Sequence, residues 1–272
     1  MAHIPLEDNF NDVIAKAQQG LAMDDAMLAR RVGLDPAALR ALQQGQFDEA
    51  AVRAVAPVLR LGADQLVALG RKAWYPEAPV FPRGFTRFNT AYEDMTVNSY
   101  LVWDAGTRLA AAFDTGATCE PMLGVIAAEK LTVRYLFLTH THEDHVADAA
   151  RLVSATGAEI YTSDREPFPS GKTFRENQTF HLGKLAVKTL LTCGHSPGQT
   201  TFFVTGLAWP LAICGDSMFA SSMGRGFVSY EDQRRNNLEK IFTLPRDTVI
   251  APGHGPLTTL AQERKHNPFF AQ

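Results

Sequence analysis

The stretch THTHEDHV, residues 139–146, places three histidines and two acidic residues within six consecutive positions. It follows VRYLFLT (133–139), an apolar run typical of a buried strand, and leads into HVADAARLVSATG (145–157), which has the apolar spacing of a helix. A solvated polar loop is one interpretation of such a junction. Chance should produce this pattern on the order of once in several thousand chains of this size, so we favour a functional interpretation.

The spacing of the polar residues predicts half of a metal site. Alternate residues of an extended loop point the same way, so His140 and His142 can hold one ion together. Asp144 and His145 lie at the turn into the following helix and can face a neighbouring position. The loop therefore offers four candidate ligands.

Three further candidates follow strand-like runs elsewhere in the chain. His195 lies in CGHSPGQT, Asp216 in CGDSMF and His254 in APGHGP, each just past an apolar run. Residues at the ends of separate strands can converge on one edge of a sheet, and function is often carried by loops on such a scaffold. We therefore expect these three residues to join the first four.

The ligand types predict two divalent metal ions. Imidazole and carboxylate without a thiolate pair suit zinc, the ion we expect first, and also iron or manganese. Seven ligands are too many for one tetrahedral ion with an open position, but they suit two ions that share a carboxylate. Two such ions can lower the pKa of a shared water and polarise a carbonyl, which favours hydrolysis. We interpret Cys193 and Cys214 as buried small residues within strands.

The motifs HTHEDH, GHSPGQ, GDSMF and PGHG, in this order, resemble the metal motifs of the metallo-β-lactamase superfamily over about residues 85–270. The resemblance implies an α/β fold, a four-layer αβ/βα sandwich with the site at one edge of its two sheets. It assigns one metal to His140, His142 and His195 and the other to Asp144, His145 and His254, with Asp216 as the bridge. Zinc β-lactamases usually carry cysteine or serine at the position of Asp216, so antibiotic hydrolysis is disfavoured.

Within the superfamily, the chain is similar to the glyoxalase II group of thioester hydrolases. The similarity lies in GDSMFASSMGR (215–225), in LPRDTVIAPGHGPLTTLAQERKHNPF (244–269) and in FDTG (113–116). It implies hydrolysis of a hydroxyacylglutathione-type thioester, with Asp114 hydrogen-bonded to a ligand loop and Arg225 as a candidate to bind a substrate carboxylate.

The resemblance also suggests how the site would work and where it departs from the group. Asp144 or Asp216 is expected to hold the proton of the attacking hydroxide. We expect the chain to lack the C-terminal helical domain that helps bind glutathione, and GFVSYED follows Gly224-Arg225 in place of the usual Thr-Asp continuation. A lactonase or other ester hydrolase, and a persulfide dioxygenase with a single iron, therefore remain alternatives.

Composition divides the chain near residue 75. Residues 1–75 carry about five helical patterns, 76–84 form a Pro-rich linker, and 85–272 alternate strands with helices as an α/β domain does. Strand-like runs lie at 98–104, 108–114, 133–139, 158–163, 185–191, 200–206, 210–215 and 247–252. Helical patterns lie at 120–130, 145–157, 231–244 and 258–265.

The N-terminal part resembles a helix-turn-helix domain of the phage-repressor type, in MLARRVGLDPAALRALQQG (27–45) and the two helical patterns after it. This raises the alternative of a metabolite-sensing DNA-binding regulator. Residues 1–75 hold eight Lys and Arg against nine Asp and Glu, a net charge of −1, whereas DNA binders neutralise phosphates. We therefore expect no nucleic-acid partner, and a helical domain that dimerises the protein or covers the mouth of the site.

The bulk composition agrees with a globular enzyme that acts on a small molecule. The chain has 272 residues, a net charge of −3 and three scattered cysteines, which suits free thiols in a reducing compartment. The start, MAHIPLEDNFNDVIAK, lacks the pattern of a signal peptide, and no run of 18 apolar residues indicates a membrane span. We expect a cytoplasmic protein with no membrane association.

Overall fold

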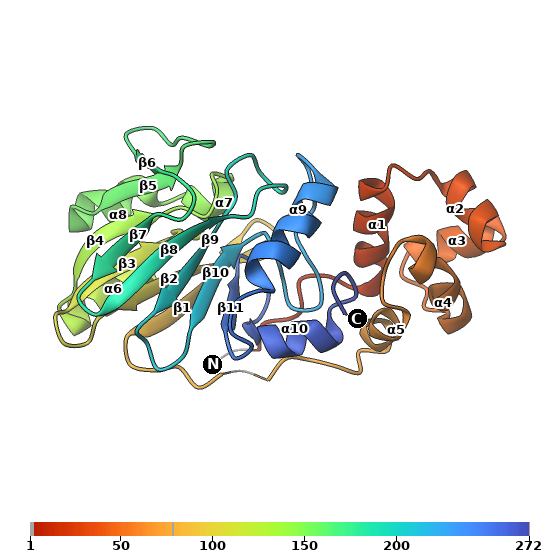
Figure 1. The fold of residues 1–272 in the computed structure, drawn as a ribbon, viewed down its shortest axis with the longest axis horizontal. Helices are drawn as coiled ribbons and strands as arrows, with labels where there is room; N and C mark the ends of the chain where they lie inside the picture. The colour runs from red at the N-terminus through yellow and green to blue at the C-terminus, as the bar shows by residue number, and fades with distance from the viewer. Residues whose placement is uncertain (1–2, 78, 272) are drawn as a thin grey trace.

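The computed structural model describes residues 3–77 and 79–271, in which two sheets and their covering helices adjoin an N-terminal group of helices (Figure 1). The N-terminal helices are α1 Phe10–Gly20, α2 Asp25–Val32, α3 Pro36–Gln43, α4 Glu49–Val58 and α5 Ala63–Gly70. Aspartates begin three of them: the side chains of Asp24, Asp35 and Asp48 each accept a hydrogen bond from a backbone N–H of the first turn. The helical patterns of the sequence are confirmed.

The sheets have six strands each. The first has the order β1-β2-β3-β4-β5-β6 and the second β12-β11-β10-β9-β8-β7. The first contains β1 Phe85–Tyr92, β2 Met95–Trp103, β3 Leu109–Phe113, β4 Thr132–Phe137, β5 Glu159–Ser163 and β6 Lys172–Phe174. The second contains β7 Thr179–Leu182, β8 Leu185–Leu191, β9 Thr200–Thr205, β10 Leu211–Gly215, β11 Val249–Pro252 and β12 Thr258–Thr259. Pairing is parallel from β3 to β6 and between β10 and β11, and antiparallel elsewhere.

Buried aromatic rings fill the space between the two sheets. Phe202 of β9 lies with its ring centroid 5.4 Å from Phe113 of β3 and 5.0 Å from Phe137 of β4. The outer face of the first sheet is covered by α6 Glu120–Glu129 and α8 Ala149–Thr156, whose Met122 and Leu152 are fully buried. The second sheet is covered by α9 Tyr230–Asn236, a π-helix Asn237–Ile241 and α10 Leu260–His266. These layers confirm the four-layer αβ/βα sandwich.

Several elements differ from the sequence expectation. The strands β1, β6, β7 and β12 were not expected; all four lie at or next to the sheet edges, and three of them have four residues or fewer. The single helix expected over 145–157 is divided into α7 Glu143–Val146 and α8. The division occurs at Asp148. Its backbone N–H donates to Thr115 Oγ1 instead of continuing the helical hydrogen bonds, and its side chain accepts a hydrogen bond from Cys119 N.

The N-terminal helices share one apolar core with the outer layer of the sandwich. Leu28 of α2 belongs to the same buried cluster as Met218, Tyr230 and Phe269. Hydrogen bonds cross the same boundary, from Gly62 N to Pro268 O at 2.7 Å. Figure 1 shows α9 and α10 between the second sheet and these helices. A domain boundary near residue 75 remains a prediction, but residues on the two sides of it are packed together.

Within the described residues, no helix has both the length and the apolar character needed to cross a membrane.

The shared core predicts that the two parts unfold together. Leu28 is completely buried, and replacing it with alanine should lower the free energy of unfolding by about 2–5 kcal/mol. The loss should appear equally in helical circular dichroism and in tryptophan fluorescence, because Trp103 lies in β2 of the first sheet. Val80→Ala, at a side chain that is 88% exposed, is the control. A Leu28→Ala transition confined to the helical signal would contradict the shared core.

Candidate metal centre

The fold brings all seven predicted ligands together at one edge of the sandwich. They lie on loops or a short helix at the carboxyl ends of β4, β8, β10 and β11, strands that belong to both sheets. These residues are His140, His142, Asp144, His145, His195, Asp216 and His254. The helix α7, which carries Asp144 and His145, begins directly after His142.

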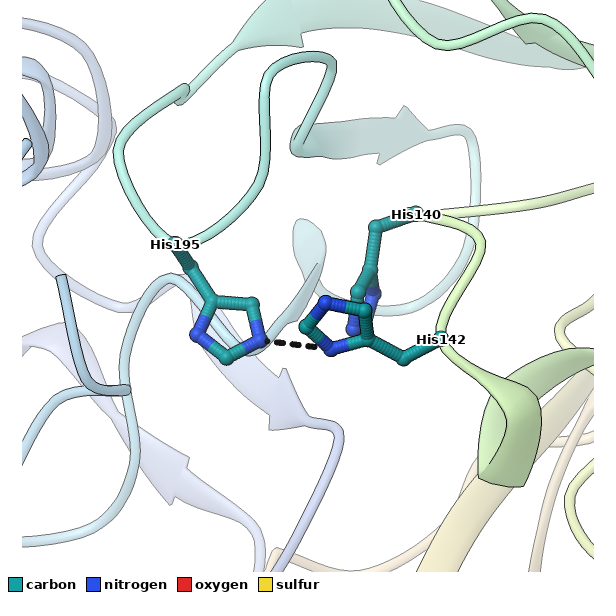
Figure 2. A group of neighbouring side chains, drawn as sticks. All are labelled: His140, His142 and His195. Atoms are coloured by element: carbon teal, nitrogen blue, oxygen red, sulfur yellow. Dashed lines mark hydrogen bonds between the residues drawn. The ribbon is translucent and has the colours of Figure 1, made fainter. Parts of the chain in front are cut away.

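His140, His142 and His195 form the first cluster, called here the three-histidine group. One nitrogen of each ring lies within 4.8 Å of a nitrogen of the other two. Figure 2 shows His140 and His142 on one loop facing His195 on another, with His195 Nε2 and His142 Nδ1 3.1 Å apart. Three imidazoles converging from two loops form a face that can bind one divalent ion.

Asp144, His145 and His254 form the second cluster, called here the Asp-His-His group. Asp144 Oδ2 lies 3.2 Å from His254 Nε2 and 3.3 Å from His145 Nε2. The three ligand atoms again lie within 4.8 Å of one another.

Asp216 lies between the two groups and reaches both. Its Oδ1 is 3.4 Å from His145 Nε2, and its Oδ2 is 3.4 Å from His195 Nε2 and 3.6 Å from His254 Nε2. The carboxylate is therefore placed where it can bridge two ions.

Buried polar atoms without hydrogen bonds show that the cluster fits cations. His140 Nε2, His145 Nε2 and Asp216 Oδ1 are all buried, and none of them has a hydrogen-bond partner. Buried polar atoms in native proteins are almost always satisfied, so three in one cluster require an explanation. Divalent ions between these atoms would satisfy all three, and the donor set of imidazoles and carboxylates matches zinc, iron or manganese.

The remaining ring nitrogens are held by the surrounding chain. His145 Nδ1 donates to Asp114 Oδ2 at 2.9 Å, His195 Nδ1 to Arg225 O at 2.8 Å and His254 Nδ1 to Thr96 O at 2.8 Å. Such contacts fix the tautomer and direct Nε2 toward a metal.

Asp114 makes the hydrogen bonds that the sequence suggests. Besides His145, its carboxylate accepts from the backbone N–H and the hydroxyl of Thr139, both at 2.8 Å. Thr139 directly precedes His140, so Asp114 connects the loop of the first group with a residue of the second. Its importance for metal binding remains a prediction.

The charges of the two groups differ. Burial, together with the neighbouring charge of His145, holds the pKa of His140 well below its usual value of 6.5, and burial also lowers the pKa of His195. Burial lowers the pKa of His145 and of His254 too. The negative charge of Asp216 is the largest of the opposing effects, which together raise these pKa values to about 10 and about 11. For the carboxylate of Asp216 burial acts in the other direction and raises the pKa. The positive charges of His254 and His145 outweigh burial and hold that pKa well below its usual value.

One glycine is required for the approach of these side chains. A Cβ on Gly253 would lie 2.1 Å from Asp216 Oδ1 and 2.7 Å from His145 Cε1, closer than any side chain can be. Gly253 therefore leaves room for the bridging carboxylate next to His254.

The cysteines are not in either group. Cys214 is buried in β10, where burial raises its pKa well above its usual value. Cys193 differs from expectation, because it is only half-buried and lies in a turn beyond the end of β8. Burial raises the pKa of its thiol as well, so both residues favour the neutral form.

Sequence analysis missed two residues beside the site. Phe227, 64% exposed, lies with its ring centroid 5.4 Å from that of His195 and 6.3 Å from that of His142. Glu166 accepts hydrogen bonds from both loops of the three-histidine group. GFVSYED, which follows Arg225 in place of the usual Thr-Asp continuation, was the sequence feature that pointed to Phe227. A single Glu after a strand has no characteristic spacing, so no such feature pointed to Glu166.

A family model described as the metallo-beta-lactamase superfamily matches residues 92–254. The chain belongs to this superfamily. Its relatives include the hydroxyacylglutathione hydrolase GloC of Haemophilus influenzae, 29% identical over 198 residues that cover 64% of this chain and 92% of that protein. Another is the hydroxyacylglutathione hydrolase of Fuscovulum blasticum, 29% identical, where the match covers 57% of this chain and 61% of that enzyme. The match spans only about 60% of the length of several such relatives.

Solved structures show the same superfamily fold. TTHA1623 in a di-iron-bound form aligns with a TM-score of 0.56 and 27% identity over 67% of this chain and 99% of that one. The B3 metallo-beta-lactamase BLEG-1 aligns with a TM-score of 0.61 and 24% identity over 69% of this chain and 100% of that one, which shows a common fold.

The raised histidine pKa values predict that metal binding releases protons. At pH 7.5 the metal-free protein carries protons on His145 and His254, whose pKa values are about 10 and about 11. A protonated imidazole cannot bind a metal, so zinc should displace about two protons from the Asp-His-His group. The dependence of the calorimetric binding heat on the ionisation enthalpy of the buffer measures this number. Zinc binding at pH 7.5 without proton release would contradict the assignment.

The same shifts set the direction of a stability effect. Because the folded pKa values lie above 6.5, the two protonated histidines stabilise the metal-free fold fully below pH 6.5. This contribution is lost as the pH rises through about 10 to about 11.

Proposed function

We propose that this superfamily member is a dinuclear metal-dependent hydrolase of thioesters of the hydroxyacylglutathione type. The observation that carries the proposal is the pair of three-residue groups joined by Asp216, with unpartnered buried atoms directed between them. The three-histidine group would hold one ion and the Asp-His-His group the other, with Asp216 shared. Zinc is the first candidate, and the di-iron form of TTHA1623 supports iron as an alternative. When bound, the ions would supply Lewis acidity for a water and for the substrate carbonyl.

The side chains around the ions have separate roles in this proposal. Asp144 and Asp216 are the acids nearest the centre. Nearby histidines outweigh the effect of burial and lower both pKa values, so each stays ionised and can accept a hydrogen bond from the attacking water. The leaving group of a thioester is a thiolate, whose conjugate acid has a pKa near 8.5, so departure needs no strong general acid. The histidines serve as ligands, and Asp114 keeps His145 in one orientation.

A small cavity next to the site can take part of the thiol portion of the substrate. It has a volume of about 180 Å³ and lies between α1 and the 225–230 segment, with Lys16, Gln19, Arg225 and Tyr230 among its lining residues. The backbone of Arg225 binds His195, so the cavity adjoins the three-histidine group.

Arg225 is the candidate for a substrate carboxylate in this cavity. Its Nη1 donates to Gln19 Oε1 at 2.8 Å, and the guanidinium carbon lies 6.0 Å from the ring centroid of Phe227. Among the described residues Arg225 forms no ion pair, whereas Lys16 is paired with Asp8 at 2.5 Å. The guanidinium is therefore oriented and available for a carboxylate.

The contacts of α1 support the proposal that the helical part covers one side of the site. Lys16 Nζ also donates to Met223 O at 3.0 Å, and this carbonyl directly precedes Gly224-Arg225. A homodimer formed through this part, and the expected absence of a nucleic-acid partner, stay predictions.

The relatives named as hydroxyacylglutathione hydrolases favour a thioester over the other esters. Metal-loaded protein should hydrolyse S-D-lactoylglutathione with kcat/KM on the order of 10⁴ M⁻¹s⁻¹ or more. Asp216→Asn should abolish this activity because the amide loses the charge shared by the two groups, while Asp247→Asn, at an exposed aspartate, should keep it. Hydrolysis only of lactones or simple esters, or oxygen consumption with a persulfide, would contradict the thioester assignment.

Arg225→Gln tests the recognition of the thiol portion. Loss of a charge-assisted hydrogen bond to a carboxylate costs about 1.5–3 kcal/mol, so KM should rise about tenfold to a hundredfold while kcat changes little. Arg60→Gln, at an exposed arginine paired with Glu231, is the matched control. An unchanged KM would remove Arg225 from the substrate site.

A further inference from the structure

One carboxylate joins the two loops that carry the three-histidine group. Glu166 Oε1 accepts from Thr141 N at 2.8 Å and from Thr141 Oγ1 at 2.7 Å. Glu166 Oε2 accepts from Ser196 Oγ at 2.5 Å and from Gly198 N at 2.8 Å. Thr141 lies between His140 and His142, and Ser196 directly follows His195.

Glu166 is itself held firmly in a turn after β5. Its backbone N–H donates to Ser163 O at 3.0 Å, and its carbonyl accepts from Thr162 Oγ1 at 2.8 Å. Because β5 belongs to the first sheet and the loop of His195 joins β8 to β9 of the second, the Glu166 side chain connects the two sheets at the edge where the site lies.

Gly198 is fitted to this arrangement. A Cβ at position 198 would lie 2.4 Å from Glu166 Cβ and 3.0 Å from Glu166 N. Only a glycine lets the loop of His195 approach Glu166 closely enough for both hydrogen bonds to Oε2.

The four contacts match a carboxylate that only accepts hydrogen bonds. Such a group has about four acceptor positions and no donor, so it can accept all four hydrogen bonds at once, and its charge strengthens each of them. An amide of the same shape presents an NH₂ on one side. The hydroxyls of Thr141 and Ser196 could turn to accept from that NH₂, but a backbone N–H cannot.

We propose that Glu166 is a positioning residue that sets the separation between His195 and the pair His140 and His142. The proposal rests on the proposed metal-dependent function, and it concerns only the three-histidine group. A hydrogen bond from Thr200 N to Thr139 O at 2.8 Å already joins the two loops at one end of each. Glu166 therefore fixes the remaining segments of the loops, which carry the three histidines. The Asp-His-His group is held instead by Asp114 and Thr96.

Glu166→Gln is expected to weaken metal binding at the three-histidine group by about 10- to 100-fold, the usual effect of removing a support behind metal ligands. Ser196→Ala removes a single hydrogen bond and should have a smaller effect in the same direction. Glu159→Gln, at an exposed glutamate on β5 that pairs with Lys172 at 2.6 Å, is the matched control and should bind like the parent protein.

The experiment is a Co²⁺ titration of metal-free protein followed by visible absorption, with thermal unfolding of each metal-free variant as the folding control. The parent should bind two equivalents with distinct spectra. Glu166→Gln should bind one equivalent as the parent does and the other more weakly with an altered spectrum, and added metal should restore its kcat.

The outcomes separate the two proposals. If the parent fails to bind two equivalents, the proposed dinuclear function is wrong. If the parent binds two and folded Glu166→Gln has affinities within about twofold and an unchanged spectrum, the positioning role is wrong while the function stands. Should Glu166→Gln not fold, Ser196→Ala decides: parental affinity and spectrum in that variant overturn the proposal.

Discussion

The site depends on Asp216, a buried carboxylate shared by two clusters of imidazoles. Buried charges persist only where partners compensate the loss of water, and Asp216 has His145, His195 and His254 within 3.6 Å. The charge of Asp216 leads the effects that raise the pKa of His145 and His254, whereas burial holds the pKa of His140 well below its usual value. Without the carboxylate, burial would favour neutral imidazoles, so the protonation of His145 and His254 and the proposed metal chemistry rest on the same charge.

The clustering of the seven candidate residues was predictable from the sequence because most of the information behind it is local. H-x-H-x-D-H places four candidates on one loop, and the other three each follow an apolar strand, so sheet geometry alone brings them together. Glu166 and Phe227 were not predictable in this way, since their contacts cross between sheets and depend on loop conformations. The strands β1, β6, β7 and β12 were missed because edge strands need less apolar sequence than central ones.

The N-terminal helices contact the part of the superfamily fold that carries the site. Their patterns resemble a DNA-binding unit, yet Lys16 and Gln19 of α1 contact the segment that holds His195 through Arg225. The shared core explains this placement, because α1 packs on the same layer as Tyr230 and Phe269. In the proposed function these helices shape the substrate cavity.

Anomalous diffraction from crystals grown with zinc would test the central claim most directly. The account predicts two peaks flanking Asp216, each at about 2.0–2.2 Å from its ligands. One should contact His140, His142 and His195, and the other Asp144, His145 and His254. A single peak, or peaks away from these side chains, would contradict a dinuclear centre.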